Sequence, residues 1–142
     1  MKASLLYRIA SVLLVLFAAG HTIGFRRTKP EWGVDPLITS MQQTHFGVDG
    51  FSRTYWSFYV GFGLFVSVLL LFAALVAWQL GSLPASTLLL MRVVAWGLAI
   101  SFVIVTILSW RYFFIAPIVF SVIITACLIA AAWLSGKPAQ SQ

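Results

Sequence analysis

The sequence predicts an all-α fold: a membrane-embedded four-helix bundle with a long first loop that carries a short interfacial helix. Of its 142 residues, 61% are hydrophobic and only 8% are charged, whereas an average soluble domain has about 25% charged residues. Four apolar stretches each reach the roughly 20 residues that cross a hydrocarbon core of about 30 Å. Tryptophans near the ends of these stretches fit the aromatic belts of membrane proteins. Together these features exclude a water-soluble globule.

The four predicted spans cover residues 5–25, 55–80, 85–109 and 114–134. Gly81 and Pro84 separate the second span from the third, as expected for a turn. Pro117 falls in the first turn of the fourth span, where its missing N–H does no harm. We therefore predict a single transmembrane domain over residues 1–134, followed by a disordered polar tail over 135–142.

The first span has a second interpretation as a secretory signal peptide. A basic N-terminal region precedes the apolar run at residues 9–19, and Ala18-Ala19-Gly20 resembles a signal-peptidase site. However, the apolar stretch continues past this site to Phe25. We therefore interpret it as a retained membrane span.

The charge pattern indicates membrane contacts and not nucleic-acid binding. Nine Lys and Arg residues against three acidic residues give a net charge of +6, and the basic residues are scattered in ones and twos beside apolar runs. This pattern is typical of topology signals and of contacts to anionic lipid headgroups. The expected partner is membrane lipid, with a membrane-protein partner or a homo-oligomer left open. The basic residues divide almost evenly between the two sides, so orientation stays open.

Topology gathers the polar side chains at one end of the predicted bundle, because the first and third loops lie on the same side. Both histidines and all three acidic residues of the chain lie on that side. The candidate ligand-binding residues there are His21, His45, Arg53, Tyr59 and Arg111. The two histidines are also the candidate catalytic residues.

The first loop is long for so small a membrane protein, which favours a role of its own. Its middle part, residues 36–46, is predicted to form a short helix with Asp35 as N-cap and Pro36 at the first helical position. Such a helix would lie at the interface as a lid over the bundle mouth. The alternative is a plain surface linker.

His21 stands out because a histidine within a span is costly unless it is paired or faces a cavity. Gly20 and Gly24 flank it, and we expect these glycines to let a helix or a ligand come close. The alternative is a structural hydrogen bond from His21 to a loop carbonyl or a headgroup.

Other chemistries have little support in the sequence. The two histidines would suffice as axial haem ligands, but a metal site normally needs three or four ligands, and no His-x-x-x-His or Cys-x-x-Cys spacing occurs. No Gly-x-Ser-x-Gly elbow is present. Cys127 lies deep in the fourth span, where we expect it to be inert. We predict no metal site, and the cofactor stays unknown.

Three motifs carry a resemblance to a known group of proteins. They are the Gly-His-Thr-Ile-Gly-Phe run at residues 20–25, the set of Met41, His45 and Phe46 in the first loop, and Tyr-Trp-Ser-Phe-Tyr-Val-Gly-Phe-Gly at residues 55–63. In these the chain resembles small bacterial four-span proteins of unknown function, which look broadly like the DoxX-type membrane proteins. The resemblance covers nearly the whole chain. It implies a four-helix bundle in the bacterial cytoplasmic membrane and no particular reaction.

Two functions of different classes remain. The favoured one is a small integral membrane protein that binds a lipid-like molecule or serves as an accessory subunit, because no complete catalytic constellation is present. The alternative is a membrane enzyme acting on a quinone, sterol or isoprenoid, with His21 as acid/base and His45 or a loop acid as its partner. Transport is a weaker third, because the spans contain no acidic residue for an ion relay.

Overall fold

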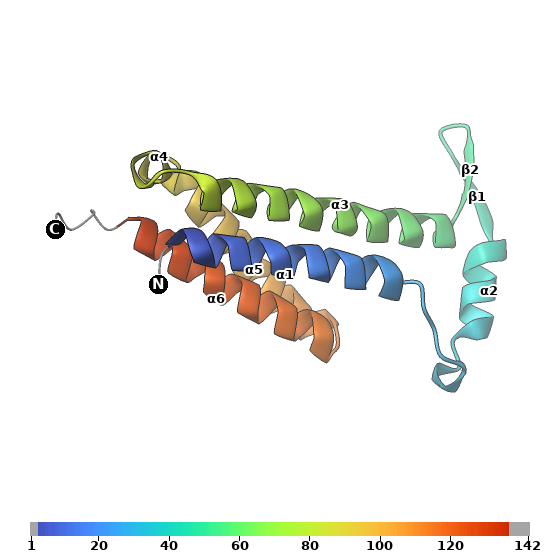
Figure 1. Cartoon of the computed structure of the whole chain (residues 1–142). Coiled ribbons are helices and arrows are strands. Elements are labelled where there is room, and N and C mark those ends of the chain that lie inside the picture. Colours follow the sequence, from blue (N-terminus) through green and yellow to red (C-terminus); the bar gives the residue numbers. More distant parts are fainter. Residues whose placement is uncertain (1–2, 137–142) are drawn as a thin grey trace. The chain divides into compact units, whose positions relative to one another are not determined.

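The computed structural model describes residues 3–136, which are mostly helical (Figure 1). Four helices are long and apolar enough to cross a membrane: α1 (Ala3–Gly24), α3 (Tyr55–Ser82), α5 (Arg92–Tyr112) and α6 (Ile115–Ser135). The shorter elements are η1 (Pro30–Trp32), α2 (Asp35–Gln43), β1 (His45–Val48), β2 (Phe51–Thr54) and α4 (Ala85–Leu90). The prediction of an all-α chain with four membrane-length helices is confirmed, with one small hairpin added.

The third predicted span differs most from the structure. Pro84 caps the six-residue helix α4, and the backbone then turns at Met91 before α5 begins at Arg92. Arg92 is therefore the first residue of the apolar helix and does not lie inside it. At the other end, Ser135 still belongs to α6; residues 137–142 of the predicted disordered tail lie outside the described residues.

The chain divides into two compact units, and α1 and α3 each contribute to both. The first unit comprises Met1–Phe17 and Leu70–Gln142, and the second comprises Ala18–Leu69. Each unit is described separately below.

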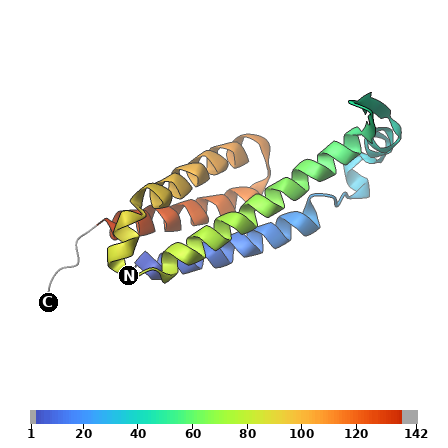
Figure 2. The ribbon, with the colours of Figure 1, turned by 90° about the horizontal axis from the view of Figure 1, so that it is seen from above.

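Helices α5 and α6 pack side by side in the first unit (Figure 2). The Thr125 hydroxyl lies 2.9 Å from the Thr106 hydroxyl and donates to the Phe102 carbonyl across the helix pair, also at 2.9 Å. Ala95 and Ala99, four residues apart on α5, are almost fully buried. Small buried residues and hydroxyl bonds are how membrane helices associate, because lipid tails are as apolar as leucine.

The start of α1 comes close to the end of α3 within the same unit. A Cβ atom added to Gly81 would lie 3.0 Å from the Ser4 carbonyl oxygen and 3.1 Å from Tyr7 Cβ. A larger residue at this helix crossing would therefore need its neighbours to shift by a few tenths of an ångström. The largest fully buried side chains of the unit are those of Tyr7, Leu14, Leu80, Ile124 and Leu128.

The second unit contains α2 and a two-stranded antiparallel hairpin between the ends of α1 and α3. The tip of the hairpin is Asp49-Gly50, with φ of 49° and 82°, which is the positive-φ pair that two-residue hairpin loops favour. Thr54 ends β2 and caps α3, because its hydroxyl accepts the Ser57 backbone N–H at 3.1 Å. The hairpin is absent from the sequence prediction.

The predicted loop helix forms, with two corrections. It ends at Gln43, and His45 and Phe46 belong to β1 instead. Val34 takes the N-cap position predicted for Asp35, which with Pro36 falls in the first turn of α2. The negative charge of Asp35 there still complements the positive end of the helix dipole.

Candidate functional site

In the second unit, His21 is bonded to the backbone of α3. Its Nε2 lies 2.9 Å from the Gly63 carbonyl oxygen. Because a carbonyl can only accept, Nε2 carries the hydrogen and donates it. The imidazole also stacks on Phe25, with ring centroids 5.1 Å apart and planes 13° apart. His21 is thus held on two sides by its own unit.

Gly63 lies directly under the Phe25 ring. A Cβ atom placed on Gly63 would lie 2.4 Å from Phe25 Cε2, so only glycine fits without movement of the ring. Tyr59 holds the other side of Phe25, because its hydroxyl donates to the Phe25 carbonyl and the two ring centroids are 5.9 Å apart. His21 and Tyr59 therefore flank one ring that rests on one glycine.

One turn further along α3, hydroxyl groups make a second polar contact between α1 and α3. The Thr22 and Ser67 hydroxyls lie 2.8 Å apart, and Ser67 donates to the Gly63 carbonyl at 3.2 Å. The Gly63 carbonyl thus accepts from the side chains of both Ser67 and His21. Gly20 and Gly24, expected to provide close approach beside His21, instead face open space.

This arrangement gives His21 a helix-packing contact. Among residues 3–136, no carboxylate and no second histidine is hydrogen-bonded to it. A general base needs its reacting proton or its orienting partner within about 2.6–3.2 Å. The imidazole donates its Nε2 proton to a backbone carbonyl and receives no orientation from an acid.

His45 and Arg53 lie on the hairpin of the same unit and are exposed. His45 Nδ1 is 3.3 Å from the Ser52 hydroxyl. The Arg53 guanidinium donates to the Ser52 carbonyl at 2.9 Å and lies 5.1 Å from the Phe51 ring centroid. Their partners are thus residues of the hairpin itself.

Arg53 also borders a shallow hollow of about 260 Å³ on the second unit. The hollow is lined by Arg53, Ser57, Phe58, Gly61, Phe62 and Phe65. Arg111, the fifth candidate, belongs to the first unit. It is exposed in the last turn of α5, with its guanidinium 5.8 Å from the Tyr112 ring. The five predicted residues thus fall into three local settings.

The acidic residues of the first loop have local roles. Glu31 pairs with Lys29 at 3.7 Å, Asp35 begins α2 and Asp49 forms the hairpin tip. Within residues 3–136, no three His, Cys, Asp or Glu side chains gather closely enough to hold a metal ion.

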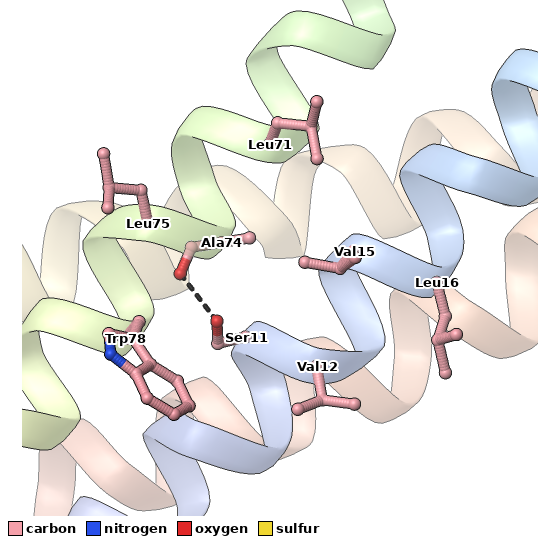
Figure 3. A pocket seen from close by; sticks show the side chains of 8 residues that line it. All are labelled: Ser11, Val12, Val15, Leu16, Leu71, Ala74, Leu75 and Trp78. Atoms are coloured by element: carbon pink, nitrogen blue, oxygen red, sulfur yellow. Dashed lines mark hydrogen bonds between the residues drawn. The ribbon is translucent and has the colours of Figure 1, made fainter.

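A second hollow lies in the first unit, between α1 and α3 (Figure 3). This α1–α3 groove has a volume of about 450 Å³ and is open along one side. Its lining residues are Ser11, Val12, Val15 and Leu16 from α1 and Leu71, Ala74, Leu75 and Trp78 from α3. Seven of these eight side chains are apolar.

Two small residues form the floor of the α1–α3 groove. Ser11 and Ala74 are almost completely buried, and the Ser11 hydroxyl donates to the Ala74 carbonyl at 2.8 Å. Larger side chains such as Val12, Leu71 and Leu75 stand at the sides and are each at least half exposed. The groove forms because small residues let the helices approach while the larger ones project around them.

Sequence reasoning missed this groove. Ser11 and Ala74 are the signal for it, because both are small residues within apolar spans. A single sequence does not say which faces of two helices meet, however, so their pairing is visible only in the structure.

No family model, curated protein or solved structure matches the chain. The resemblance to DoxX-type proteins therefore stays a prediction, and the groove and the His21 contacts are interpreted from their own chemistry.

Proposed function

We propose that this chain is an integral membrane protein that binds a lipid-like molecule along the α1–α3 groove. The observation that carries the proposal is the groove itself, which is an open surface groove with apolar sides along two helices of membrane-spanning length. The surface of such helices faces hydrocarbon in a bilayer. A molecule that occupies the groove must therefore present an apolar chain.

The chemistry of the floor supports a flexible chain as the ligand. The one hydroxyl in the groove, on Ser11, already donates to the Ala74 carbonyl. Sites for compact ligands place a few polar groups to orient them, whereas here the other polar side-chain group of the lining is the single indole N–H of Trp78. A volume of about 450 Å³ lies within the roughly 300–1,000 Å³ usual for small-molecule sites. An acyl or isoprenoid chain meets these conditions.

The proposal includes the location of the protein. We assign it to the bacterial cytoplasmic membrane on its resemblance to bacterial four-span proteins. We also assign α2 and the hairpin to the membrane interface, where α2 would serve as the predicted lid. Trp32 of η1 and Leu37 of α2 support this, because these large apolar side chains are 56% and 61% exposed, as in interfacial helices.

Lipid binding explains more of the structure than catalysis by His21 does. The imidazole is committed to the Gly63 carbonyl and to the Phe25 ring. No observation favours His21 as an acid/base on a quinone, sterol or isoprenoid. In the accessory role, a helix of another subunit would cover the groove in place of a lipid.

Native mass spectrometry of the protein in mild detergent tests the proposal. The Leu71→Trp variant places a bulky ring in the groove. Its matched control is Leu69→Trp, on the same helix and 64% exposed at a position that does not line the groove. We expect wild type and Leu69→Trp to carry bound lipid, and Leu71→Trp to lose it.

A third variant separates the groove from the polar contacts. We expect His21→Ala to keep its lipid, because His21 does not line the groove. Lipid lost from His21→Ala and kept by Leu71→Trp would overturn the proposal and move the ligand site to the second unit. Wild type without lipid, or as a dimer that Leu71→Trp converts to monomer, would also overturn it and favour a protein partner.

A further inference from the structure

Arg8 lies at the end of the α1–α3 groove. Its guanidinium carbon is 5.6 Å from the centroid of the Trp78 ring, and Trp78 lines the groove. The stem of Arg8 packs beside Gly81, where an added Cβ atom would come within 3.1 Å of Arg8 Cγ. The side chain is thus held at its stem and at its head.

The contact with Trp78 gives the Arg8 donors no hydrogen-bond acceptor. A guanidinium has five N–H donors in its plane. No hydrogen bond from Arg8 to another residue is found among residues 3–136, and the one ion pair in that range joins Lys29 to Glu31. Arg8 therefore presents a fork of donors that suits two oxygens of a phosphate.

The first unit carries basic side chains and no acidic side chain of its own. All three acidic residues, Glu31, Asp35 and Asp49, lie in the second unit. The first unit holds five basic residues and no acidic one: Lys2, Arg8, Arg92, Arg111 and Lys137. No side-chain carboxylate of the first unit can therefore neutralise Arg8, although a charge beside hydrocarbon is stable only with a partner or with access to the headgroups.

We propose that the α1–α3 groove binds an anionic phospholipid, with the phosphate on Arg8 and an acyl chain along the groove. This rests on the proposed lipid-binding function. The groove lining runs from Ser11 to Leu16 on α1 and back from Trp78 to Leu71 on α3, and Arg8 precedes Leu16 on α1 by about 12 Å, at 1.5 Å per residue. The acyl chain of the lipid enters the groove beside Trp78, and tryptophan is a residue type that favours the headgroup level.

A second copy of the protein fits the groove less well. Two grooves brought face to face would join two basic, acid-free units, and like charges placed opposite each other are costly. An anionic lipid supplies both features that the site lacks, a negative charge and an apolar chain.

The test is a lipid titration of delipidated protein, followed by native mass spectrometry. Phosphatidylglycerol and phosphatidylcholine with identical acyl chains are compared, so that only the headgroup charge differs. We expect wild type to bind phosphatidylglycerol about tenfold more tightly. Arg8→Gln should lose this preference and bind the two lipids with similar affinity, because phosphatidylcholine carries the same phosphate with its charge balanced by choline. The control Arg92→Gln removes another arginine of the same unit that does not line the groove, and it should keep the preference.

The outcomes separate this inference from the proposed function. Equal binding of both lipids by wild type, or a preference that survives in Arg8→Gln, would overturn the headgroup assignment and leave the groove as a lipid site. Absence of binding by either lipid would overturn both. If Arg8→Gln does not fold, Trp78→Leu replaces it: removal of the ring that holds the guanidinium should reduce the preference, and an unchanged preference would overturn the inference.

Discussion

Substitution of Gly63 by alanine should destabilise the protein, whereas the same substitution at Gly61 should not. The added Cβ at Gly63 would lie 2.4–2.8 Å from three carbons of the Phe25 ring, while a Cβ at Gly61 meets nothing within 4 Å. Both glycines lie in α3, two residues apart. They form a matched pair that differs in the contact with Phe25.

The expected magnitude follows from two opposing effects. Alanine in place of glycine in a helix interior is favourable by about 0.5–1 kcal/mol, and this gain applies to both positions. Overpacking a fitted contact typically costs about 1–3 kcal/mol. The Phe25 ring has little freedom to escape this cost, because it stacks on His21 and contacts Tyr59. The unfolding free energy of Gly63→Ala should therefore lie about 1–3 kcal/mol below that of Gly61→Ala.

The measurement is the unfolding free energy of each purified variant, from titration of mild-detergent micelles with a denaturing detergent and circular dichroism. A second comparison in a Phe25→Ala background completes a double-mutant cycle. Without the ring, Gly63→Ala should behave like Gly61→Ala. Equal stability of the two single variants, or a penalty that persists without Phe25, would refute the packing described for His21, Phe25 and Gly63.

Three further substitutions test other contacts. Gly81→Ala should lower the unfolding free energy by about 1–3 kcal/mol, because the added Cβ would lie 3.0 Å from the Ser4 carbonyl oxygen. Its control is Gly97→Ala, where the added Cβ would meet no atom within 4 Å; this substitution should be neutral or stabilising. Tyr7→Phe should raise the unfolding free energy by about 1 kcal/mol, because the buried Tyr7 hydroxyl makes no hydrogen bond of good geometry among the described residues. A clear loss would show that the nearby Ser135 side chain bonds to it. Gly50→Ala should cost roughly 1–2 kcal/mol at a φ of 82° and speed amide exchange in the hairpin. Gly47→Ala, in β1 with free space around it, serves as its control.

The helices were largely predictable because a bilayer admits only long apolar segments. Composition alone placed three of the four long helices within a few residues of their observed ends. The third span was placed too early, because hydropathy does not register the turn at Met91 that separates α4 from α5. Asp49-Gly50 is a strong signal for a hairpin turn. The hairpin is nevertheless absent from the prediction, because the helical periodicity of the preceding residues extends the predicted helix to Phe46, across the first residues of β1.

The candidate site was less predictable, because it depends on which helix faces meet. Within the second unit, His21 and Tyr59 contact the same aromatic ring, and His45 and Arg53 share one hairpin. Arg111 belongs to the other unit. Counting loops assigns residues to a side of the membrane and says nothing of contacts within it. The α1–α3 groove depends on the pairing of Ser11 with Ala74, which no periodicity reports.

The contrast between His21 and Arg8 shows how a functional residue is best recognised in such a chain. A histidine within a span is a functional candidate because an unpaired polar group there is costly. In the structure that cost is met internally, by the Gly63 carbonyl and the Phe25 ring. For Arg8 it is not, because its printed contact is with the Trp78 ring and its unit contains no acidic side chain. Other arginines also lack an acidic partner, but Arg8 contacts a residue that lines the α1–α3 groove, and it is therefore the arginine that we propose for the headgroup.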